Sequence, residues 1–231
     1  NNPGVISGLE GDDGVTIFTF LISLTGASEQ SVSVDYETRD GTATSLADYD
    51  AKSGVATFLP GTTQFQIEVN VNGDTIHECD ESFDLALTNF LVNCPEFEPP
   101  AERAAFISTA TIEEDDDVNI EIGDAVVTEG TEAPSTLHFI VTLENPSVHE
   151  ISVQYSTDHV STTSGDYQAV TNGLLTFTPG NTRTSLDVVV FEDSANECDE
   201  EMFVELHSPA APCPVVIVQD KGFGTIEDDD A

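Results

Sequence analysis

Carboxylates are the side chains of this sequence whose type and spacing could do chemistry. The 231 residues contain 44 Asp and Glu against 5 Lys and Arg, a formal net charge of -39. Many stand in dense runs, such as HECDESFDLAL at 77–87 and TIEEDDD at 111–117. Crowded carboxylates repel one another unless a cation neutralises them, and Ca²⁺ takes roughly six to eight oxygen ligands from flexible loops. The pattern predicts divalent-cation sites, with a merely solvated acidic surface as the alternative.

The same composition argues against other functions. A surface this acidic repels phosphate backbones and anionic lipid headgroups, and no apolar run reaches the roughly 20 residues of a membrane-spanning helix. Zinc is disfavoured because His and Cys do not occur at its usual spacings. Trp is absent, and no Ser/His/Asp or Cys/His arrangement stands out. We therefore expect no enzyme, no nucleic-acid binding and no direct membrane insertion.

The acidic runs belong to an internal repeat of about 119 residues. GVATFLPGTTQFQIEVNV at 54–71 matches GLLTFTPGNTRTSLDVVV at 173–190. HECDESFDLAL at 77–87 matches NECDEEMFVEL at 196–206, and TIEEDDD matches TIEDDD at 225–230. The repeat predicts two domains, residues 1–117 and 118–231, joined with almost no linker.

Within each repeat, apolar residues alternate with polar ones. Phe18, Phe20 and Ile22 share one face of a strand, and turn signals such as Pro60-Gly61 separate the runs. We expect an all-β chain of two tandem seven-stranded antiparallel immunoglobulin-like β-sandwiches. The strands expected in the first repeat are 4–10, 15–24, 31–38, 54–59, 64–72, 82–90 and 104–112.

Strand parity then gathers the acids. If successive strands run in opposite directions, the connections after the first, third and fifth strands share one end of the sandwich with the exit of the seventh. Most acids of the repeat fall in these connections, so we expect four acidic segments to converge on one tip. In the first repeat they are Glu10, Asp12, Asp13, Asp40, Asp48, Asp50, Asp74, Glu78, Asp80, Glu81 and 113–117; in the second, Glu129, Asp166, Glu192, Asp193, Glu197, Glu200 and 228–230.

These segments resemble the Calx-beta domain through nearly all of both repeats. DYETRDGTATSLADYD at 35–50, GVATFLPG, HECDESFDLAL and TIEEDDD carry the resemblance. It implies a seven-stranded sandwich with several Ca²⁺ ions at one tip. The ligands that it implies are Glu10, Asp40, Asp74, Glu78, Glu81, Glu114, Asp115, Asp116 and Asp117 in the first repeat, and Glu129, Glu192, Asp193, Glu197, Glu200, Asp228, Asp229 and Asp230 in the second.

The second repeat departs from this pattern at two positions. His159 replaces the Asp of the DGTA motif, which is Asp40 in the first repeat, and imidazole is a poor ligand for Ca²⁺. Gly73 of the first repeat stands where the second has Glu192. We expect the two repeats to differ in ion number or affinity, with fewer or weaker ions in the second.

The four cysteines occupy repeated positions, which suggests disulfides and an oxidising compartment, with free thiols as the alternative. Local pairing would join Cys79 to Cys94 and Cys198 to Cys213. A strand of about nine residues separates the two members of each pair and spans about 30 Å, too far for a disulfide. The other connectivity joins Cys79 to Cys213 and leaves Cys94 and Cys198 for neighbouring repeats or chains. Both connectivities stay open at this point.

The function expected first is that of an extracellular or cell-surface structural or adhesive module, in which Ca²⁺ at the acidic tips rigidifies a tandem array or fibre. Its partners would be neighbouring repeats or other copies of the protein, as a homo-oligomer or fibre. The alternative is a cytoplasmic Ca²⁺-sensor pair of the kind that regulates sodium–calcium exchangers. Affinity and cysteine redox state separate the two, because sensors bind at about 10⁻⁷–10⁻⁵ M and extracellular modules at about 10⁻⁴–10⁻³ M.

Overall fold

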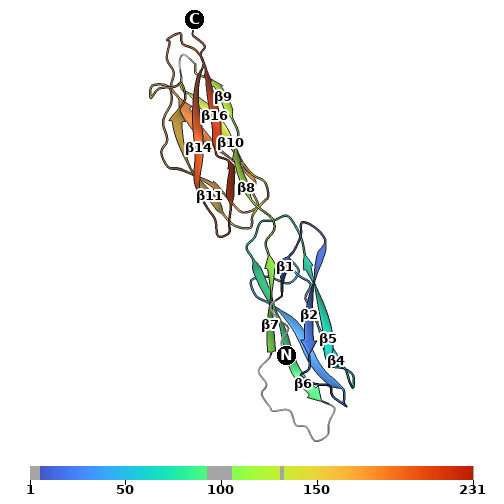
Figure 1. Ribbon diagram of the computed structural model, residues 1–231. Coiled ribbons are helices and arrows are strands. Elements are labelled where there is room, and N and C mark those ends of the chain that lie inside the picture. Colours follow the sequence, from blue (N-terminus) through green and yellow to red (C-terminus); the bar gives the residue numbers. More distant parts are fainter. Residues whose placement is uncertain (1–5, 93–105, 131–132, 231) are drawn as a thin grey trace. The chain divides into compact units, whose positions relative to one another are not determined.

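The computed structural model describes residues 6–92, 106–130 and 133–230, which form two compact units. Unit 1 comprises residues 1–75 and 79–115, and unit 2 comprises residues 76–78 and 116–231. Strands and their connecting loops make up both units (Figure 1). Over the described ranges the chain forms no helix, and therefore none long and apolar enough to cross a membrane.

Unit 1 is a β-sandwich of two sheets. A five-stranded sheet has the order β1-β7-β6-β3-β4, and β2 pairs with β5 in the second sheet. β1 runs parallel to β7, while the other pairings are antiparallel. The strands are β1 (Ile6–Leu9), β2 (Val15–Ser23), β3 (Val32–Asp40), β4 (Ser53–Phe58), β5 (Gln64–Asn72), β6 (Glu81–Val92) and β7 (Phe106–Glu113).

Alternation along the strands builds the core of unit 1, because every second side chain points between the sheets. Phe83 of β6 is fully buried, and the ring of Tyr49 stacks on it at 4.3 Å between centroids. Phe18 and Phe20 of β2 meet Phe83 at 6.3 and 6.0 Å. These aromatic contacts join β2, β6 and the β3–β4 loop, so they fix that loop against the sandwich.

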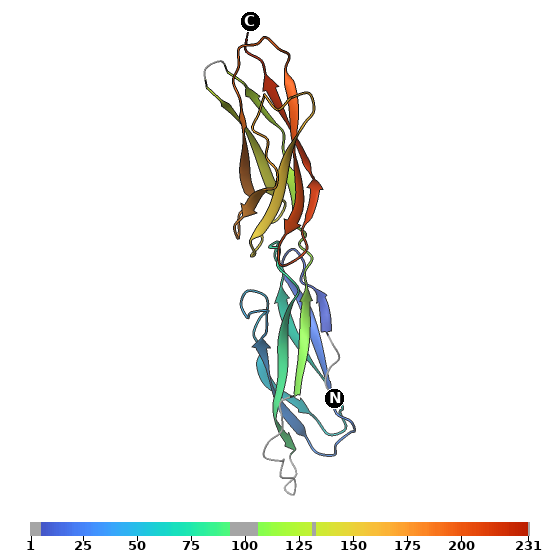
Figure 2. The ribbon, with the colours of Figure 1, turned by 90° about the vertical axis from the view of Figure 1, so that its left-hand side faces the viewer.

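Unit 2 repeats this plan, with a five-stranded sheet and a second sheet of four strands in place of two (Figure 2). One sheet has the order β12-β11-β14-β16-β9 and the other β13-β10-β8-β15. The strands are β8 (Asn119–Ile122), β9 (Ala125–Thr128), β10 (Ser135–Leu143), β11 (Ile151–His159), β12 (Gly173–Phe177), β13 (Arg183–Val190), β14 (Glu200–Ala210), β15 (Val216–Gln219) and β16 (Lys221–Glu227).

Seven strands were expected per repeat, and unit 2 has two more, β8 and β15. β8 pairs antiparallel with β10 and parallel with β15, which lies in the connection between β14 and β16. Ile120 and Ile122 of β8 are fully buried in the core of unit 2. The expected fold class, two tandem immunoglobulin-like β-sandwiches, is confirmed, with the second sandwich extended by this short strand pair.

A three-residue segment of the first repeat, residues 76–78, belongs to unit 2. His77 is buried, and its backbone N–H donates to the Pro146 carbonyl at 2.8 Å. Its carbonyl accepts from the backbone N–H of Val148 at 3.2 Å and from the Ser147 hydroxyl at 3.1 Å. Its Nδ1 donates to the Asp116 carbonyl at 2.9 Å. The loop between β5 and β6 therefore supplies one buried side chain to the compact unit of the following repeat.

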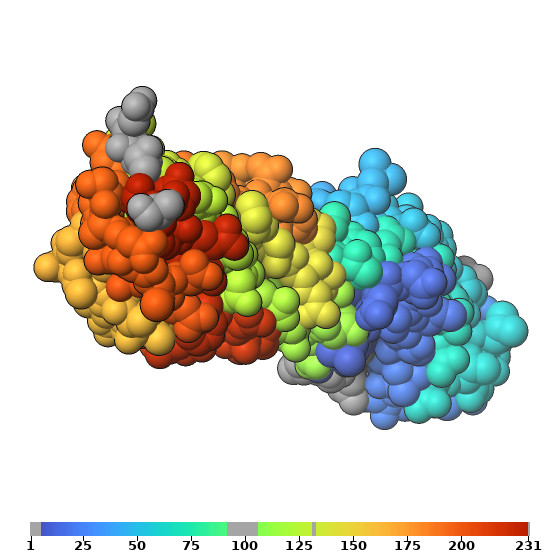
Figure 3. All heavy atoms as spheres, turned by 90° about the horizontal axis from the view of Figure 1, so that it is seen from above, coloured from blue at the N-terminus to red at the C-terminus, as the bar shows by residue number. Residues whose placement is uncertain are grey.

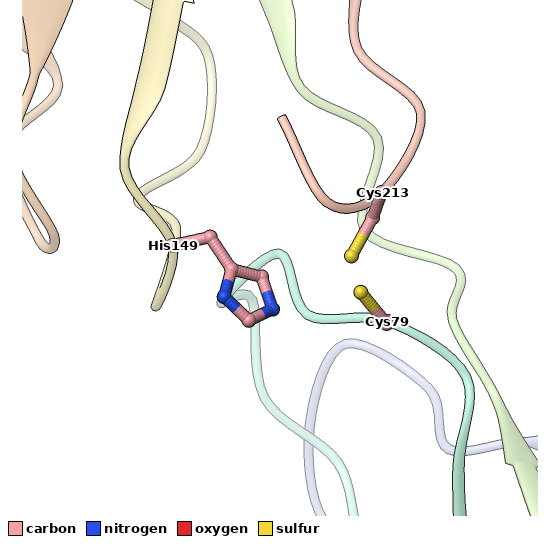
Figure 4. A group of neighbouring side chains, drawn as sticks. All are labelled: Cys79, His149 and Cys213. Carbon is pink, nitrogen blue, oxygen red and sulfur yellow. The ribbon is translucent and has the colours of Figure 1, made fainter. Parts of the chain in front are cut away.

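The cysteines decide between the two connectivities expected from the sequence. Cys79 and Cys213 are both disulfide-bonded, whereas Cys198 is an exposed free thiol (Figure 4 shows Cys79 and Cys213). The local pairing of Cys198 with Cys213 is therefore wrong, and the bonded state of Cys79 and Cys213 agrees with the second connectivity. The geometric reason is the length of β14, 11 residues, which follows Cys198 and precedes Cys213. Cys94 lies outside the described residues.

Candidate metal centres

A Glu-Gly turn in unit 2 places the first candidate ligand. Glu129 follows β9, and Gly130 adopts a positive φ of 83°, which a residue with a side chain rarely takes. This turn aims the Gly130 N–H at Oδ1 of Asp229, 3.1 Å away. The Glu-Gly turn after β9 and the acidic segment after β16 are thereby held together. Because β9 runs parallel to β16, both strands deliver their exits to the same end of the sheet.

Glu129, Asp228 and Asp230 form the first carboxylate group of unit 2. One carboxylate oxygen of each lies within 4.8 Å of the others. Glu129 is only 8% exposed, and its Oε1 and Oδ2 of Asp230 are buried without a hydrogen-bond partner. Figure 3 looks onto this end of unit 2, where the C-terminal segment in red borders the β13–β14 loop in orange. Buried carboxylate oxygens without donors are the groups that a cation would satisfy.

Burial and mutual repulsion act on the protonation of this group. Burial raises the pKa of Glu129, and the charges of Asp193, Asp228, Asp230 and Glu197 raise it further. Burial likewise raises the pKa of Asp230, and the charges of Asp229 and Asp228 add to the shift. A bound divalent cation would reverse both effects, because it favours the ionised form of every carboxylate around it.

Asp166, Glu197 and Glu200 form a second group in unit 2, again within 4.8 Å. Glu200 opens β14, and burial raises its pKa to about 7, with further contributions from a hydrogen bond to Asp166 and the charge of Asp166. Asp166 caps the β11–β12 loop by accepting from the backbone N–H of Thr163. Strand parity places Asp166 at the acidic tip, but the family resemblance does not include it among the ligands. Its counterpart Asp48 is also missing from that ligand set. Both acids stand between a small residue and a tyrosine, in Ala47-Asp48-Tyr49 and Gly165-Asp166-Tyr167.

Unit 1 repeats the Glu-Gly turn. Glu10 is 6% exposed, Gly11 has a positive φ of 86°, and its N–H donates to Oδ1 of Asp115 at 3.2 Å. A carboxylate oxygen of Glu10 lies within 4.8 Å of one of Asp74, and the same holds for Asp48 and Glu81. The predicted convergence of distant acidic segments is therefore found within unit 1.

Asp40 stands apart from these carboxylate groups in the described part of the chain. Its Oδ1 accepts a hydrogen bond from the Tyr49 hydroxyl at 2.6 Å and another from the backbone N–H of Ser45 at 2.9 Å. The Tyr49 hydrogen bond, followed by that of Ser45, lowers the pKa of Asp40. In unit 2 the corresponding residue is His159, whose ring packs 5.1 Å from that of Tyr167. The His-for-Asp exchange thus replaces a charged hydrogen bond with a ring contact.

Gly73 shows why unit 1 lacks the acid that unit 2 has as Glu192. A Cβ atom on Gly73 would lie 2.0 Å from the Gly11 carbonyl oxygen, a distance that no side chain tolerates. The Gly73 N–H also donates to the Gly14 carbonyl at 3.1 Å. The β1–β2 loop approaches Gly73 too closely for a glutamate there, whereas Glu192 is exposed in the β13–β14 loop.

The remaining predicted ligands lie in or beside these loops. In unit 1, the backbone N–H of Glu114 donates to Oδ1 of Asp80 at 3.1 Å. Glu78, Asp116 and Asp117 belong to unit 2, where Asp116 is buried and the Asp117 carbonyl accepts from Asn145. Asp193 accepts from the Ala195 N–H at 2.7 Å, and Asp228 accepts from the Glu197 N–H at 3.3 Å.

The donor set of these groups is oxygen alone, which suits a hard cation such as Ca²⁺. Cys79 and Cys213 (Figure 4) are cysteines whose sulfur atoms could, as thiolates, bind a softer metal such as zinc. Both cysteines are disulfide-bonded, so neither offers the thiolate that zinc requires. Among the residues that the structure describes, the carboxylate groups are therefore the candidate metal centres.

Comparison with known proteins agrees with the repeat. A model of the Calx-beta domain family matches residues 6–116 and again residues 113–230. The chain belongs to the Calx-beta family. The two Calx-beta domains are 28% identical over 207 residues to sodium/calcium exchanger 1 of Bos taurus, covering 84% of the chain and 21% of that protein. They are 29% identical over 202 residues to human sodium/calcium exchanger 2, covering 82% and 22%. The chain spans about a fifth of the length of these relatives.

Solved structures similar to the Calx-beta pair include a crystal structure of CBD12 from CALX1.2. It is 22% identical, covers 97% of both chains and has a TM-score of 0.42. A crystal structure of the calcium binding domain CBD12 of CALX1.1 is 23% identical, covers 89% of this chain and 77% of that one, and has a TM-score of 0.41.

Proposed function

We propose that this Calx-beta pair is a calcium-binding structural module, in which Ca²⁺ held by the acidic loops rigidifies a tandem array or fibre. The observation that carries the proposal is the Glu129–Asp228–Asp230 group. Two of its oxygens are buried without donors, and its carboxylates lie within 4.8 Å of one another. Such a group is repulsive when empty and favourable when it surrounds a cation.

The residues that would hold Ca²⁺ in unit 2 are Glu129, Asp228 and Asp230, together with Asp166, Glu197 and Glu200. In unit 1, the close pairs Glu10 with Asp74 and Asp48 with Glu81 would contribute. Several ions per domain would bind, with fewer or weaker ions in the second repeat, where His159 replaces Asp40. Bound Ca²⁺ would supply charge neutralisation and cross-links between loops that are distant in sequence.

The disulfide-bonded Cys79 and Cys213 support an extracellular or cell-surface location, because disulfides persist in oxidising compartments. Partners would then be neighbouring repeats or other copies of the protein. The second candidate function, a cytoplasmic calcium-sensing pair, is favoured by a different observation: the relatives described above are sodium/calcium exchangers.

Thermal unfolding without reductant tests the proposal. Saturating Ca²⁺ should raise the melting temperature well above that in chelator, while NaCl of equal ionic strength should not. A half-saturation near 10⁻⁴–10⁻³ M would select the extracellular module, and one near 10⁻⁷–10⁻⁵ M the sensor, on the roughly known scale of calcium modules. Equal effects of Ca²⁺ and NaCl would contradict calcium binding altogether.

A further inference from the structure

The outer face of the β14–β16 strand pair carries an aromatic pair, the half-buried Phe203 and the exposed Phe223, that the carboxylate loops do not use. Phe203 and Phe223 are directly opposite each other in the register, with ring centroids 6.3 Å apart. Met202 and Val204 on either side of Phe203 are buried, and so are Gly222 and Gly224 on either side of Phe223, so the two rings point away from the core. Phe223 is 44% exposed, and Val126 of the adjacent β9 is 62% exposed.

The first repeat shows that this fold does not require an aromatic pair here. The positions equivalent to Phe203 and Phe223 are Asp84 and Thr109, which also pair in register. The Thr109 hydroxyl donates to Oδ1 of Asp84 at 2.7 Å, an ordinary polar surface contact. Ser7 of β1 stands where unit 2 has Val126. Unit 2 alone has an apolar cluster, Phe203, Phe223 and Val126, at a place where the same sandwich is stable with polar side chains.

The surroundings of the cluster indicate which ligand chemistry it suits. The ammonium of Lys221 lies 4.2 Å from the centroid of Phe203 and 3.7 Å from Oε1 of Glu205. An aromatic face and a carboxylate therefore already hold one cation together in this structure. Glu201 and Glu205 lie two residues to either side of Phe203 on the same strand face, and Asp158 is its register partner in β11. Aromatic surface bordered by acids is complementary to apolar side chains bordered by Arg or Lys.

We propose that the outer face of β14, β16 and β9 around Phe203, Phe223 and Val126 is a docking surface for a basic polypeptide segment that presents Arg or Lys beside apolar side chains. The acids that border the cluster, Glu201, Glu205 and Asp158, argue against the same face of a second copy as the occupant, because like charges would meet there. β14 and β16 are interior strands of their sheet, so recognition would use side chains rather than addition of a strand to an open edge. The proposal goes beyond the calcium-binding function and does not depend on it.

The test uses the whole chain in saturating Ca²⁺ and about 0.15 M salt, which fills the acidic loops and screens distant charges. The probe is the synthetic peptide Ac-RLRLRL-NH₂. Calorimetry measures its affinity, and changes in amide chemical shifts locate its binding site. The decisive variant is Phe203→Asp with Phe223→Thr, which installs the residues of the first repeat. It adds one negative charge, so simple electrostatic attraction predicts binding that is unchanged or tighter. The docking surface predicts binding about tenfold weaker, with wild-type shifts centred on β14, β16 and β9.

Lys221→Ala supplies an opposite expectation. It removes the resident ammonium from Phe203 and Glu205, so the peptide should bind more tightly, and Lys52→Ala in unit 1 is the matched control for lost positive charge. Val126→Ser is the milder test if the double variant unfolds at a lower temperature than wild type. Peptide binding that survives Phe203→Asp with Phe223→Thr, or shifts confined to the acidic loops, would overturn the proposal. So would self-association in sedimentation that the double variant abolishes, since the occupant would then be a second copy.

Discussion

The hydroxyl of Tyr49 donates a 2.6 Å hydrogen bond to Oδ1 of Asp40 across the β3–β4 loop of unit 1. The same tyrosine ring stacks on the buried Phe83 at 4.3 Å. One side chain therefore ties the end of β3 both to the hydrophobic core and to a carboxylate. Burial and the hydrogen bond to Asp40 raise the pKa of Tyr49 to about 12, so the phenol stays a donor over the whole physiological range.

Tyr49→Phe should lower the melting temperature of the calcium-free protein by a few degrees, since it removes a charge-assisted hydrogen bond without emptying the core. The effect should be largest above pH 4 and fade as acid protonates Asp40, because a carboxyl with a lowered folded-state pKa contributes stability only where it is ionised. Tyr167→Phe in unit 2 is the matched control, since His159 replaces the aspartate there. A larger loss for Tyr167→Phe than for Tyr49→Phe would refute this account.

The raised pKa of Glu200 predicts that the stability of the calcium-free protein, measured in chelator, depends on pH. Its folded-state pKa is raised from 4.5 to about 7. Between these two values the folded protein keeps a proton that the unfolded chain has lost, so stability should fall as pH rises through this window. Glu200→Gln should flatten the decline and make the calcium-free protein more stable above pH 7. Melting curves from pH 4.5 to 8 measure this, with the exposed Glu201→Gln as control.

For Glu200, a decline that persists unchanged in Glu200→Gln would assign the titration to other groups. Saturating Ca²⁺ should also remove the decline in wild type, because a bound cation keeps the carboxylates ionised at neutral pH.

Glu129→Gln should separate the two effects of the buried carboxylate group. Without Ca²⁺ the variant should be more stable than wild type, because it relieves repulsion among Glu129, Asp228 and Asp230. With Ca²⁺ it should be less stable, and its affinity in unit 2 should fall about tenfold or more as a charged ligand is lost. Calorimetry measures the affinity and thermal unfolding the stability; the control is Glu227→Gln, which changes an exposed acid at the end of β16. Equal calcium affinity in Glu129→Gln and wild type would remove Glu129 from the site.

The cysteines predict a simple chemical outcome. In the absence of reductant, Cys198 should react at once with maleimide, while Cys79 and Cys213 should stay unlabelled. Cys79→Ser with Cys213→Ser should destabilise the protein by about 2–5 kcal/mol, the usual cost of removing a native disulfide. Non-reducing peptide mapping checks the bond itself. A Cys198–Cys213 peptide in that map would contradict the structure.

The sequence predicted the strands and the acidic tips well because both follow from local pattern. The strand expected at 64–72 is β5 to the residue, and the one expected at 15–24 is β2 within one residue. Alternation fixes which side chains face the core, and strand parity fixes which loops share an end. Alternation and strand parity can both be read from the sequence without knowing how the strands pack.

What the sequence did not predict depends on contacts between distant segments. β8 and β15 are four residues each and pair parallel to one another across nearly a hundred residues, so neither stands out as a strand alone. The Tyr49 hydroxyl donates a hydrogen bond to Asp40, whereas the sequence pattern indicated only a metal ligand at this position. Asp166 joins Glu197 and Glu200 only because the β11–β12 loop folds onto the start of β14. Gly73 is required by the approach of the Gly11 backbone, which no spacing rule reveals.

Calorimetric titration of the wild-type chain with CaCl₂ tests most directly whether the acidic loops bind calcium. The titration should be run without reductant in buffer of fixed moderate ionic strength, with MgCl₂ as the parallel titrant. We expect saturable binding of several Ca²⁺ ions and loss of part of the signal in Glu129→Gln. Mg²⁺ should bind more weakly, because it requires a near-ideal octahedron and gives up its waters reluctantly. Heats that do not saturate, or that are the same for Ca²⁺, Mg²⁺ and matched NaCl, would mean that the carboxylates only solvate the surface.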